Sequence, residues 1–115
     1  VIFFPHLAFD FLPHEQSFFT TAYSTKKAKN ISYNARTRAI RGANCSEAIK
    51  HDFQVMMQRY VDATTTLMQQ LFPGYTSKIQ TGRTSFRPIE IAGRTPKSIR
   101  KDDTKLHVDA FPTSP

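Results

Sequence analysis

Cysteine, acidic residues and long apolar runs are scarce in this chain of 115 residues, and tryptophan is absent. The single cysteine, Cys45, excludes an intramolecular disulfide and favours a reducing cytoplasm. We interpret Cys45 as a small buried side chain rather than a nucleophile, because no histidine or aspartate motif flanks it. The apolar stretches fall far short of the roughly 18 residues that a transmembrane helix needs, which argues against a membrane span.

The remaining composition is that of a globular chain. Hydrophobic residues make up 39% and charged residues 22%, a balance that does not indicate disorder. The length fits one domain or part of one. The chain starts Val-Ile-Phe-Phe-Pro, with neither a methionine nor a basic residue ahead of the apolar run. This start is unlike a secretory signal, and we expect the sequence to be cut from a longer one.

Positive charge is the strongest compositional signal, because 16 lysines and arginines against 9 acidic residues give a formal net charge of +7. Such an excess favours anionic partners. Two clusters hold most of it: Lys26, Lys27, Lys29, Arg36, Arg38 and Arg41 in the first, and Arg83, Arg87, Arg94, Lys97, Arg100, Lys101 and Lys105 in the second. For any one of these residues, a solvated surface position is the simpler interpretation.

Three kinds of anionic partner fit these clusters. Nucleic acid is one, with Tyr23, Tyr33 and Phe86 near enough in sequence to stack on bases, but no helix-turn-helix, zinc-finger or RNP signature supports it. A phosphorylated, carboxylate-rich glycolipid is the second, and the anionic inner leaflet of a membrane is the third. Composition alone leaves all three open.

Residues 1–45 divide into an aromatic arm and a basic, irregular segment. Pro5 and Pro13 bracket residues 7–11, where large apolar residues alternate with their neighbours and predict a short strand or extended arm. A brief helix is expected to begin at Pro13. The basic stretch from Lys26 to Gly42 is interrupted by asparagine and serine and predicts hairpin-like structure that ends at Gly42.

A helix over residues 46–72 is the clearest element in the sequence. Asn44 with Glu47 has the spacing of a capping box, Ser46 is the alternative cap, and Pro73-Gly74 predicts a sharp stop. The apolar residues follow the three-and-four spacing of one stripe. They are Ile49, Phe53, Met56, Met57, Tyr60, Val61, Leu67, Met68 and Leu71. We expect this stripe to pack in a core rather than to form a ligand groove.

Strands are expected after Gly74, over residues 75–80 and 84–91. Pro88 predicts that the second of them is an edge or bulged strand. Residues 93–103 carry Pro96 and several charges, and predict a loop of the kind that often lies near a functional site. Residues 106–111 then predict a further strand.

His107-Val108-Asp109, within this last strand, is the motif that carries chemistry. Successive side chains of a strand alternate between its faces, so His107 and Asp109 project to the same side and can grip one metal ion. His-x-Asp supplies two of the three protein ligands of non-haem Fe(II) oxygenases. The spacing is common by chance, so the pair taken bare favours a structural role over metal ligation.

The sequence around this motif resembles the Kdo hydroxylase family, most specifically in the run RKDDTKLHVDAFP. The earlier stretches VIFFPHLAFDFLPHE and KKAKNISYNARTRAIRG resemble the same family, so the resemblance covers essentially the whole chain. Members of this family are bacterial dioxygenases that use Fe(II) and 2-oxoglutarate to hydroxylate Kdo, the acidic sugar of the lipopolysaccharide inner core.

The resemblance implies a fold and a set of roles. The fold would be α+β, with the long helix packed on the first strands of a double-stranded β-helix, the jelly roll, which is incomplete in this chain. Residues 1–115 would form the N-terminal part of one dioxygenase domain. His107 and Asp109 would be iron ligands, whereas the second ligand histidine and the 2-oxoglutarate-binding arginine would lie downstream. We therefore expect the isolated chain to be inactive.

Substrate and location are further expectations. Arg100, Lys101 and Lys105 are candidate contacts to the carboxylate or phosphates of a Kdo-containing glycolipid. The resemblance implies a cytoplasmic enzyme with peripheral contact to the inner membrane and no nucleic-acid partner. The alternative function is a basic, non-catalytic module that binds nucleic acid or anionic lipid. A zinc domain is a weaker alternative, because two ligands and one remote cysteine make a poor tetrahedral set.

Overall fold

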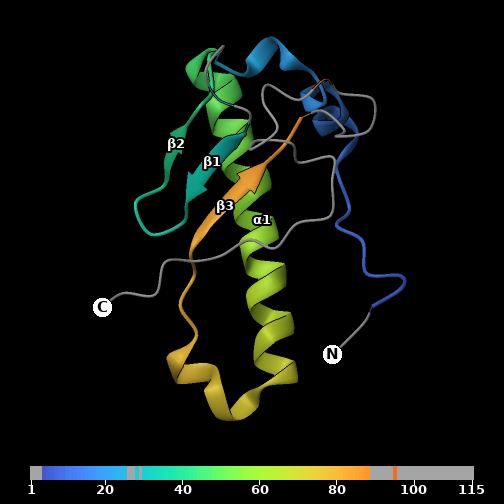
Figure 1. The fold of residues 1–115 in the computed structure, drawn as a ribbon, viewed down its shortest axis with the longest axis vertical. Coiled ribbons are helices and arrows are strands. Elements are labelled where there is room, and N and C mark those ends of the chain that lie inside the picture. Colours follow the sequence, from blue (N-terminus) through green and yellow to red (C-terminus); the bar gives the residue numbers. More distant parts are fainter. Residues whose placement is uncertain (1–3, 26–27, 29, 89–94, 96–115) are drawn as a thin grey trace.

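The structure, a computed structural model, describes residues 4–25, 28, 30–88 and 95. One long helix, α1 (Glu47–Leu71), runs the length of the molecule and carries a small sheet against its first half (Figure 1). The strands are β1 (Ile31–Asn34), β2 (Ala39–Arg41) and β3 (Arg83–Phe86), and the short 3-10 helices are η1 (Pro13–Phe18), η2 (Thr21–Tyr23) and η3 (Pro73–Lys78). The sheet is antiparallel throughout, in the order β2-β1-β3.

Local signals at its two ends account for the position of α1. Ser46 caps the first turn, where its Oγ accepts a hydrogen bond from the backbone N–H of Ile49 at 3.4 Å. Glu47 adds negative charge to that turn and pairs with Lys50 at 2.6 Å. The helix ends at Leu71, ahead of Pro73. The predicted helix is confirmed to within one residue at each end, and of the two predicted caps Ser46 is the one used.

The segment predicted as hairpin-like is a true β-hairpin. Tyr33 of β1 lies opposite Ile40 of β2, and both face α1. Gly42 follows at a φ of +80°, where a Cβ would stand 2.5 Å from the carbonyl oxygen of Asn30. Only glycine satisfies both the backbone conformation and this close approach, which explains why the hairpin ends there.

The core lies between the sheet, η1 and the first half of α1. It consists of Phe18, Ile31, Tyr33, Phe53, Met56, Met57, Val61 and Phe86. Ile31 and Tyr33 alternate with half-buried residues in β1, as expected for a strand with one face on a helix. Phe53 is fully buried and stacks on Phe18 with ring centroids 4.3 Å apart. Phe53 therefore joins η1 to α1.

Replacing Phe53 by alanine is expected to lower the free energy of unfolding by about 3 to 5 kcal/mol, because the change removes a whole buried ring and leaves a cavity. Urea denaturation of the protein measures the effect. Val55→Ala is the matched control, because Val55 is 45% exposed on the same helix and its truncation should cost less than about 1 kcal/mol. Equal losses in the two variants would contradict the assigned core.

Of two further expectations, one is wrong and one is confirmed only in part. Residues 75–80 were expected to form a strand, but residues 73–78 form η3, a 3-10 helix. Pro73 begins η3, and local bonds such as Thr76 Oγ1 to the Pro73 carbonyl at 3.0 Å satisfy its polar groups. The apolar stripe of α1 is also only partly buried, because Tyr60 and Met68 are 44% and 42% exposed.

The expected strand over residues 84–91 is found as β3, four residues long, at an edge of the described sheet. This edge position agrees with the prediction made from Pro88, which lies two residues beyond β3. Residues 89–91, the expected loop over 93–103 apart from Thr95, and the expected strand over 106–111 lie outside the described residues. In the described part, no helix combines the length and the apolar character that a membrane span requires.

Candidate functional site

The five site residues predicted from sequence lie outside the described residues. They are His107, Asp109, Arg100, Lys101 and Lys105, and their arrangement stays a prediction. Within residues 4–25, 28, 30–88 and 95, no group of three or more histidine, cysteine, aspartate or glutamate side chains is placed to hold a metal ion. His6 and His14 are exposed, and the ring of His14 contacts Phe18.

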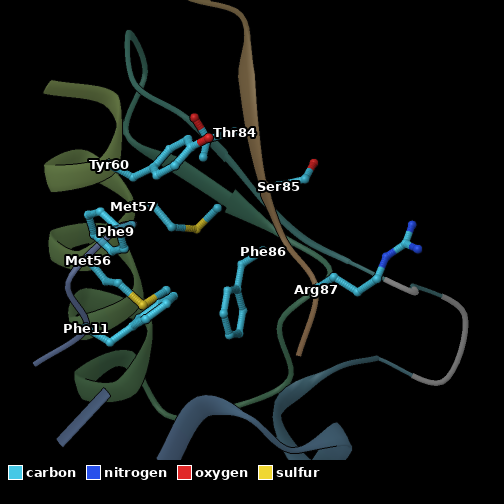
Figure 2. A pocket seen from close by; sticks show the side chains of 9 residues that line it. All are labelled: Phe9, Phe11, Met56, Met57, Tyr60, Thr84, Ser85, Phe86 and Arg87. Carbon is cyan, nitrogen blue, oxygen red and sulfur yellow. The ribbon is translucent and has the colours of Figure 1, made fainter. Parts of the chain in front are cut away.

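A half-open cavity of about 200 Å³ lies beside the core. Its walls come from the N-terminal arm, from α1 and from β3 (Figure 2). The lining residues are Phe9, Phe11, Met56, Met57, Tyr60, Thr84, Ser85, Phe86 and Arg87. Apart from Arg87 they offer no charged group, so the described walls suit an apolar ligand or a packed segment rather than acid–base chemistry.

The strand β3 separates two environments at this cavity. Phe86 points toward α1, whereas Ser85 and Arg87 point to the other side of the strand (Figure 2). This follows from the alternation of side chains in a strand. The guanidinium Nε of Arg87 donates a hydrogen bond to Asn30 Oδ1 at 3.0 Å, which extends the contact between β1 and β3 by one residue pair.

Edge-to-face aromatic contacts hold the arm over the cavity. Phe9 lies 5.1 Å from Phe11 and 5.5 Å from Tyr60, measured between ring centroids. Phe11 in turn lies 6.4 Å from Phe86. Such pairs contribute about 0.5 to 1.5 kcal/mol beyond their buried area. The arm, expected as a strand or an extended segment, has no regular secondary structure over residues 7–12 and carries no strand pairing in the described residues.

A buried carboxylate joins the arm to the middle of α1. Glu15 is 1% exposed, and its Oε1 pairs with the guanidinium of Arg59. Its Oε2 accepts a hydrogen bond from the backbone N–H of Leu12 at 2.7 Å. Arg59 also donates to the carbonyl of Asp10 at 2.6 Å and lies 5.0 Å from the centre of the Phe9 ring. The buried charge is thus matched on both oxygens.

Arg59→Met is expected to destabilise the protein by about 3 kcal/mol, because it leaves the buried carboxylate of Glu15 without its cation. Thermal unfolding with a calorimetric enthalpy measures the loss. Adding Glu15→Gln to that variant should restore part of the stability, since a neutral amide still accepts from Leu12 and no unpaired charge remains. Equal stability of the single variant and the wild type would contradict the role of the pair.

Two groups at the start of α1 have shifted pKa values. Burial raises the pKa of the Cys45 thiol, with a smaller opposing effect of Lys50. Cys45 was predicted to be a small buried side chain; it packs against the core but is only half-buried. The hydrogen bond from Lys50 to Glu47 raises the pKa of the lysine.

Sequence patterns did not identify the cavity or the buried pair. Glu15 accepts from the backbone N–H of Leu12 as the acidic residue of a capping box does, but leucine has no side-chain acceptor for the other half, so the sequence carried no capping-box pattern here. Arg59 lies 44 residues away in the chain, and no local pattern predicts that it meets Glu15.

Comparison with solved structures indicates the class of protein to which this chain is similar. Three solved structures, each described as a non-haem Fe(II) α-ketoglutarate-dependent dioxygenase, superpose on this chain; α-ketoglutarate is 2-oxoglutarate. The match to an apo structure has a TM-score of 0.82 at 41% identity, and it covers 96% of this chain and 36% of the other chain. The match to a cobalt(II) complex has a TM-score of 0.83 at 43% identity, and it covers 97% of this chain and 37% of the other. The match to a complex with α-ketoglutarate and Fe(III) has a TM-score of 0.81 at 41% identity, and it covers 97% of this chain and 36% of the other.

The family follows from the whole length of the chain. Residues 1–115 match the family of 3-deoxy-D-manno-oct-2-ulosonic acid (Kdo) hydroxylases, and the chain belongs to this family. The three solved structures are each described as the Kdo hydroxylase KdoO. The chain spans about a third of their length. A search of the curated proteins finds no match.

Proposed function

We propose that this chain is the N-terminal part of an Fe(II)- and 2-oxoglutarate-dependent dioxygenase that hydroxylates Kdo in the lipopolysaccharide inner core, on lipid A-linked Kdo. The family match over every residue of the chain carries the proposal. Identity of 41% to 43% with solved enzymes described as Fe(II) α-ketoglutarate-dependent supports the same chemistry here. Residues 1–115 then form part of one catalytic domain.

His107 and Asp109 are the proposed iron ligands of this chain. An imidazole and a carboxylate are two of the three donors of a facial triad for non-haem Fe(II), so the chemistry of the pair fits the metal. The third ligand, a histidine, and the arginine that holds 2-oxoglutarate belong to the downstream sequence. Bound iron, with 2-oxoglutarate and oxygen, supplies the oxidising power that converts a C–H bond into C–OH. The residues of this chain would hold the iron and orient the substrate.

Arg100, Lys101 and Lys105 are the proposed contacts to the anionic substrate. Kdo carries a carboxylate and lipid A carries phosphates, and arginine binds either group with two parallel hydrogen bonds. The three residues precede His107 closely in the sequence, which places them near the proposed metal ligands along the chain. The formal net charge of +7 favours approach of such a substrate.

The proposed domain is a jelly roll that the chain covers in part. A jelly roll has about eight strands, whereas the described sheet has three. Large side chains such as Leu7, Phe19 and Tyr75 are 61%, 47% and 64% exposed, as expected where further parts of a domain pack. The proposed location is the cytoplasm, with peripheral contact to the inner membrane.

The test is turnover by the full-length protein that contains this sequence. With Fe(II), 2-oxoglutarate and oxygen, we expect a Kdo-terminated glycolipid to gain one oxygen atom, detected by mass spectrometry, and succinate to form with it. Omission of iron or of 2-oxoglutarate should abolish both products. Salt-sensitive binding to oligonucleotides, without any succinate, would favour the basic non-catalytic module instead.

A further inference from the structure

The turn between β1 and β2 places an arginine in a conformation that favours glycine. Arg38 has a φ of +56°. A residue with a Cβ pays about 1 to 2 kcal/mol in this left-handed region, and glycine or asparagine normally occupies it. Because such a cost persists only where the surroundings impose it, an arginine at this point suggests a use for its side chain.

The surroundings hold the turn in a single shape. Asn34 Oδ1 accepts hydrogen bonds from the backbone N–H groups of Arg36 at 3.0 Å and Thr37 at 3.2 Å. Gln54, on α1, donates from Nε2 to the carbonyl oxygen of Arg38 at 2.7 Å. The turn is therefore tied at its start by its own strand and at its end by the helix.

Three exposed arginines gather at this end of the sheet. Arg36 and Arg38 lie in the turn, and Arg83 begins β3 directly opposite Asn34, the last residue of β1. None of the ion pairs found among the described residues involves them. The acidic residue of the grooves beside Arg36 and Arg38 is Asp62, whose Oδ1 accepts from Gln58 at 2.8 Å. Positive charge is thus in excess. We call Arg36, Arg38 and Arg83 the arginine cluster.

We propose that the arginine cluster docks the protein on the anionic phospholipid surface of a membrane. This proposal rests on the proposed function for the kind of membrane involved and adds the surface that meets it. Phosphate headgroups suit guanidinium groups, and each basic residue near an anionic bilayer adds to its affinity.

Nucleic acid is the less suitable partner for the cluster. Non-specific binding to single strands uses aromatic side chains on which bases stack. Tyr33, the aromatic residue of β1, is 1% exposed, and its hydroxyl donates to Gln58 at 2.7 Å. Its ring faces the core, so the turn offers charge without a stacking surface. A bilayer of phosphate headgroups requires only the charge.

The experiment is co-sedimentation of the full-length protein with vesicles of equimolar phosphatidylcholine and phosphatidylglycerol, against vesicles of phosphatidylcholine alone. Changing Arg36, Arg38 or Arg83 singly to glutamine should weaken binding to the anionic vesicles about fivefold, which corresponds to about 1 kcal/mol per basic residue. The triple variant should weaken it about a hundredfold on the same basis. Binding to the neutral vesicles should be weak for all proteins.

Arg38 allows a sharper comparison. Arg38→Gly removes the charge and relieves the backbone, so it should weaken vesicle binding without lowering the melting temperature. Arg38→Lys keeps the charge and should bind almost as the wild type. Gln16→Glu is the control for net charge, because it lowers the net charge of the protein by one, as the loss of one arginine does. Gln16 lies on η1, which is across α1 from the turn (Figure 1).

The outcomes separate this proposal from the proposed function. Succinate formation with a soluble Kdo oligosaccharide should be unchanged in the arginine variants, and its absence in every protein would refute the enzyme while leaving the vesicle result valid. Equal vesicle binding by the wild type and the triple variant would overturn the membrane surface. A loss of vesicle binding in Gln16→Glu equal to that of the single arginine variants would also overturn it. So would tighter binding of the wild type to single-stranded oligonucleotides than to anionic vesicles.

Discussion

Replacing His107 by alanine in the full-length protein is expected to remove iron binding and 2-oxoglutarate turnover together. Each protein ligand of a facial triad contributes directly to the small set of donors that holds Fe(II). Loss of an outer-shell partner already costs about 10- to 100-fold in metal affinity or activity, so loss of a ligand should exceed about 100-fold. Asp109→Ala should have the same effect. Iron content after desalting and the rate of succinate release measure it.

Asp103→Asn is the matched control for these two variants. It removes a carboxylate four residues before His107, outside the His-x-Asp motif. Iron content should stay at the wild-type level, whatever the effect on substrate binding. Near-normal iron content in His107→Ala, or an equal loss in Asp103→Asn, would refute the assignment of the ligands.

The isolated chain of 115 residues is expected to bind Fe(II) weakly, to bind 2-oxoglutarate hardly at all, and to form no succinate. Two ligands from one segment leave most of the coordination sphere to water. In the part of the chain that the structure describes, no further cluster of metal-binding side chains is available. His6, His14 and His51 precede the motif, whereas the proposed third ligand lies downstream of it.

Anaerobic titration of the purified chain with Fe(II) and 2-oxoglutarate tests this expectation. The visible charge-transfer band of the iron chelate should be absent, and exposure to oxygen should yield no succinate. The full-length protein under the same conditions is the positive control. A clear band with catalytic succinate formation by the chain alone would show that it contains a complete site.

Local chemistry explains which parts of the fold were predictable. The helix was, because the apolar spacing, the Ser46 cap and the stop at Pro73 all act within a few residues. The hairpin that ends at Gly42 was predictable for the same reason. Residues 75–80 read as a strand because Tyr75 and Ile79 are good strand formers, but Pro73 initiates a 3-10 helix there instead.

Burial along α1 was less predictable, because it depends on which elements lie beside the helix. The sheet and η1 cover its first half, where Phe53, Met56 and Met57 are buried. Beyond Val61 the neighbours of α1 are η3, the arm around Leu7 and residues 79–82 rather than the sheet, and Met68 stays exposed although its spacing continues the stripe. Periodicity identifies the apolar face of a helix, but it does not show how far along the helix other elements pack on that face.

The candidate site divides in the same way. The His107-x-Asp109 pair could be identified from the sequence because both donors belong to one short motif, and the family match supports the class of protein. The roles of these residues remain a proposal. The link between Glu15 and Arg59 and the cavity beside Phe9 arise only when distant segments meet, so no local pattern could indicate them.

The central claim is that His107 and Asp109 hold the iron of a Kdo hydroxylase. Anomalous diffraction at the iron absorption edge, from anaerobic crystals of the full-length protein loaded with Fe(II), tests it most directly. We expect one strong peak within bonding distance of both the His107 imidazole and the Asp109 carboxylate. An iron peak bound by other residues, with these two side chains free of it, would contradict the assignment.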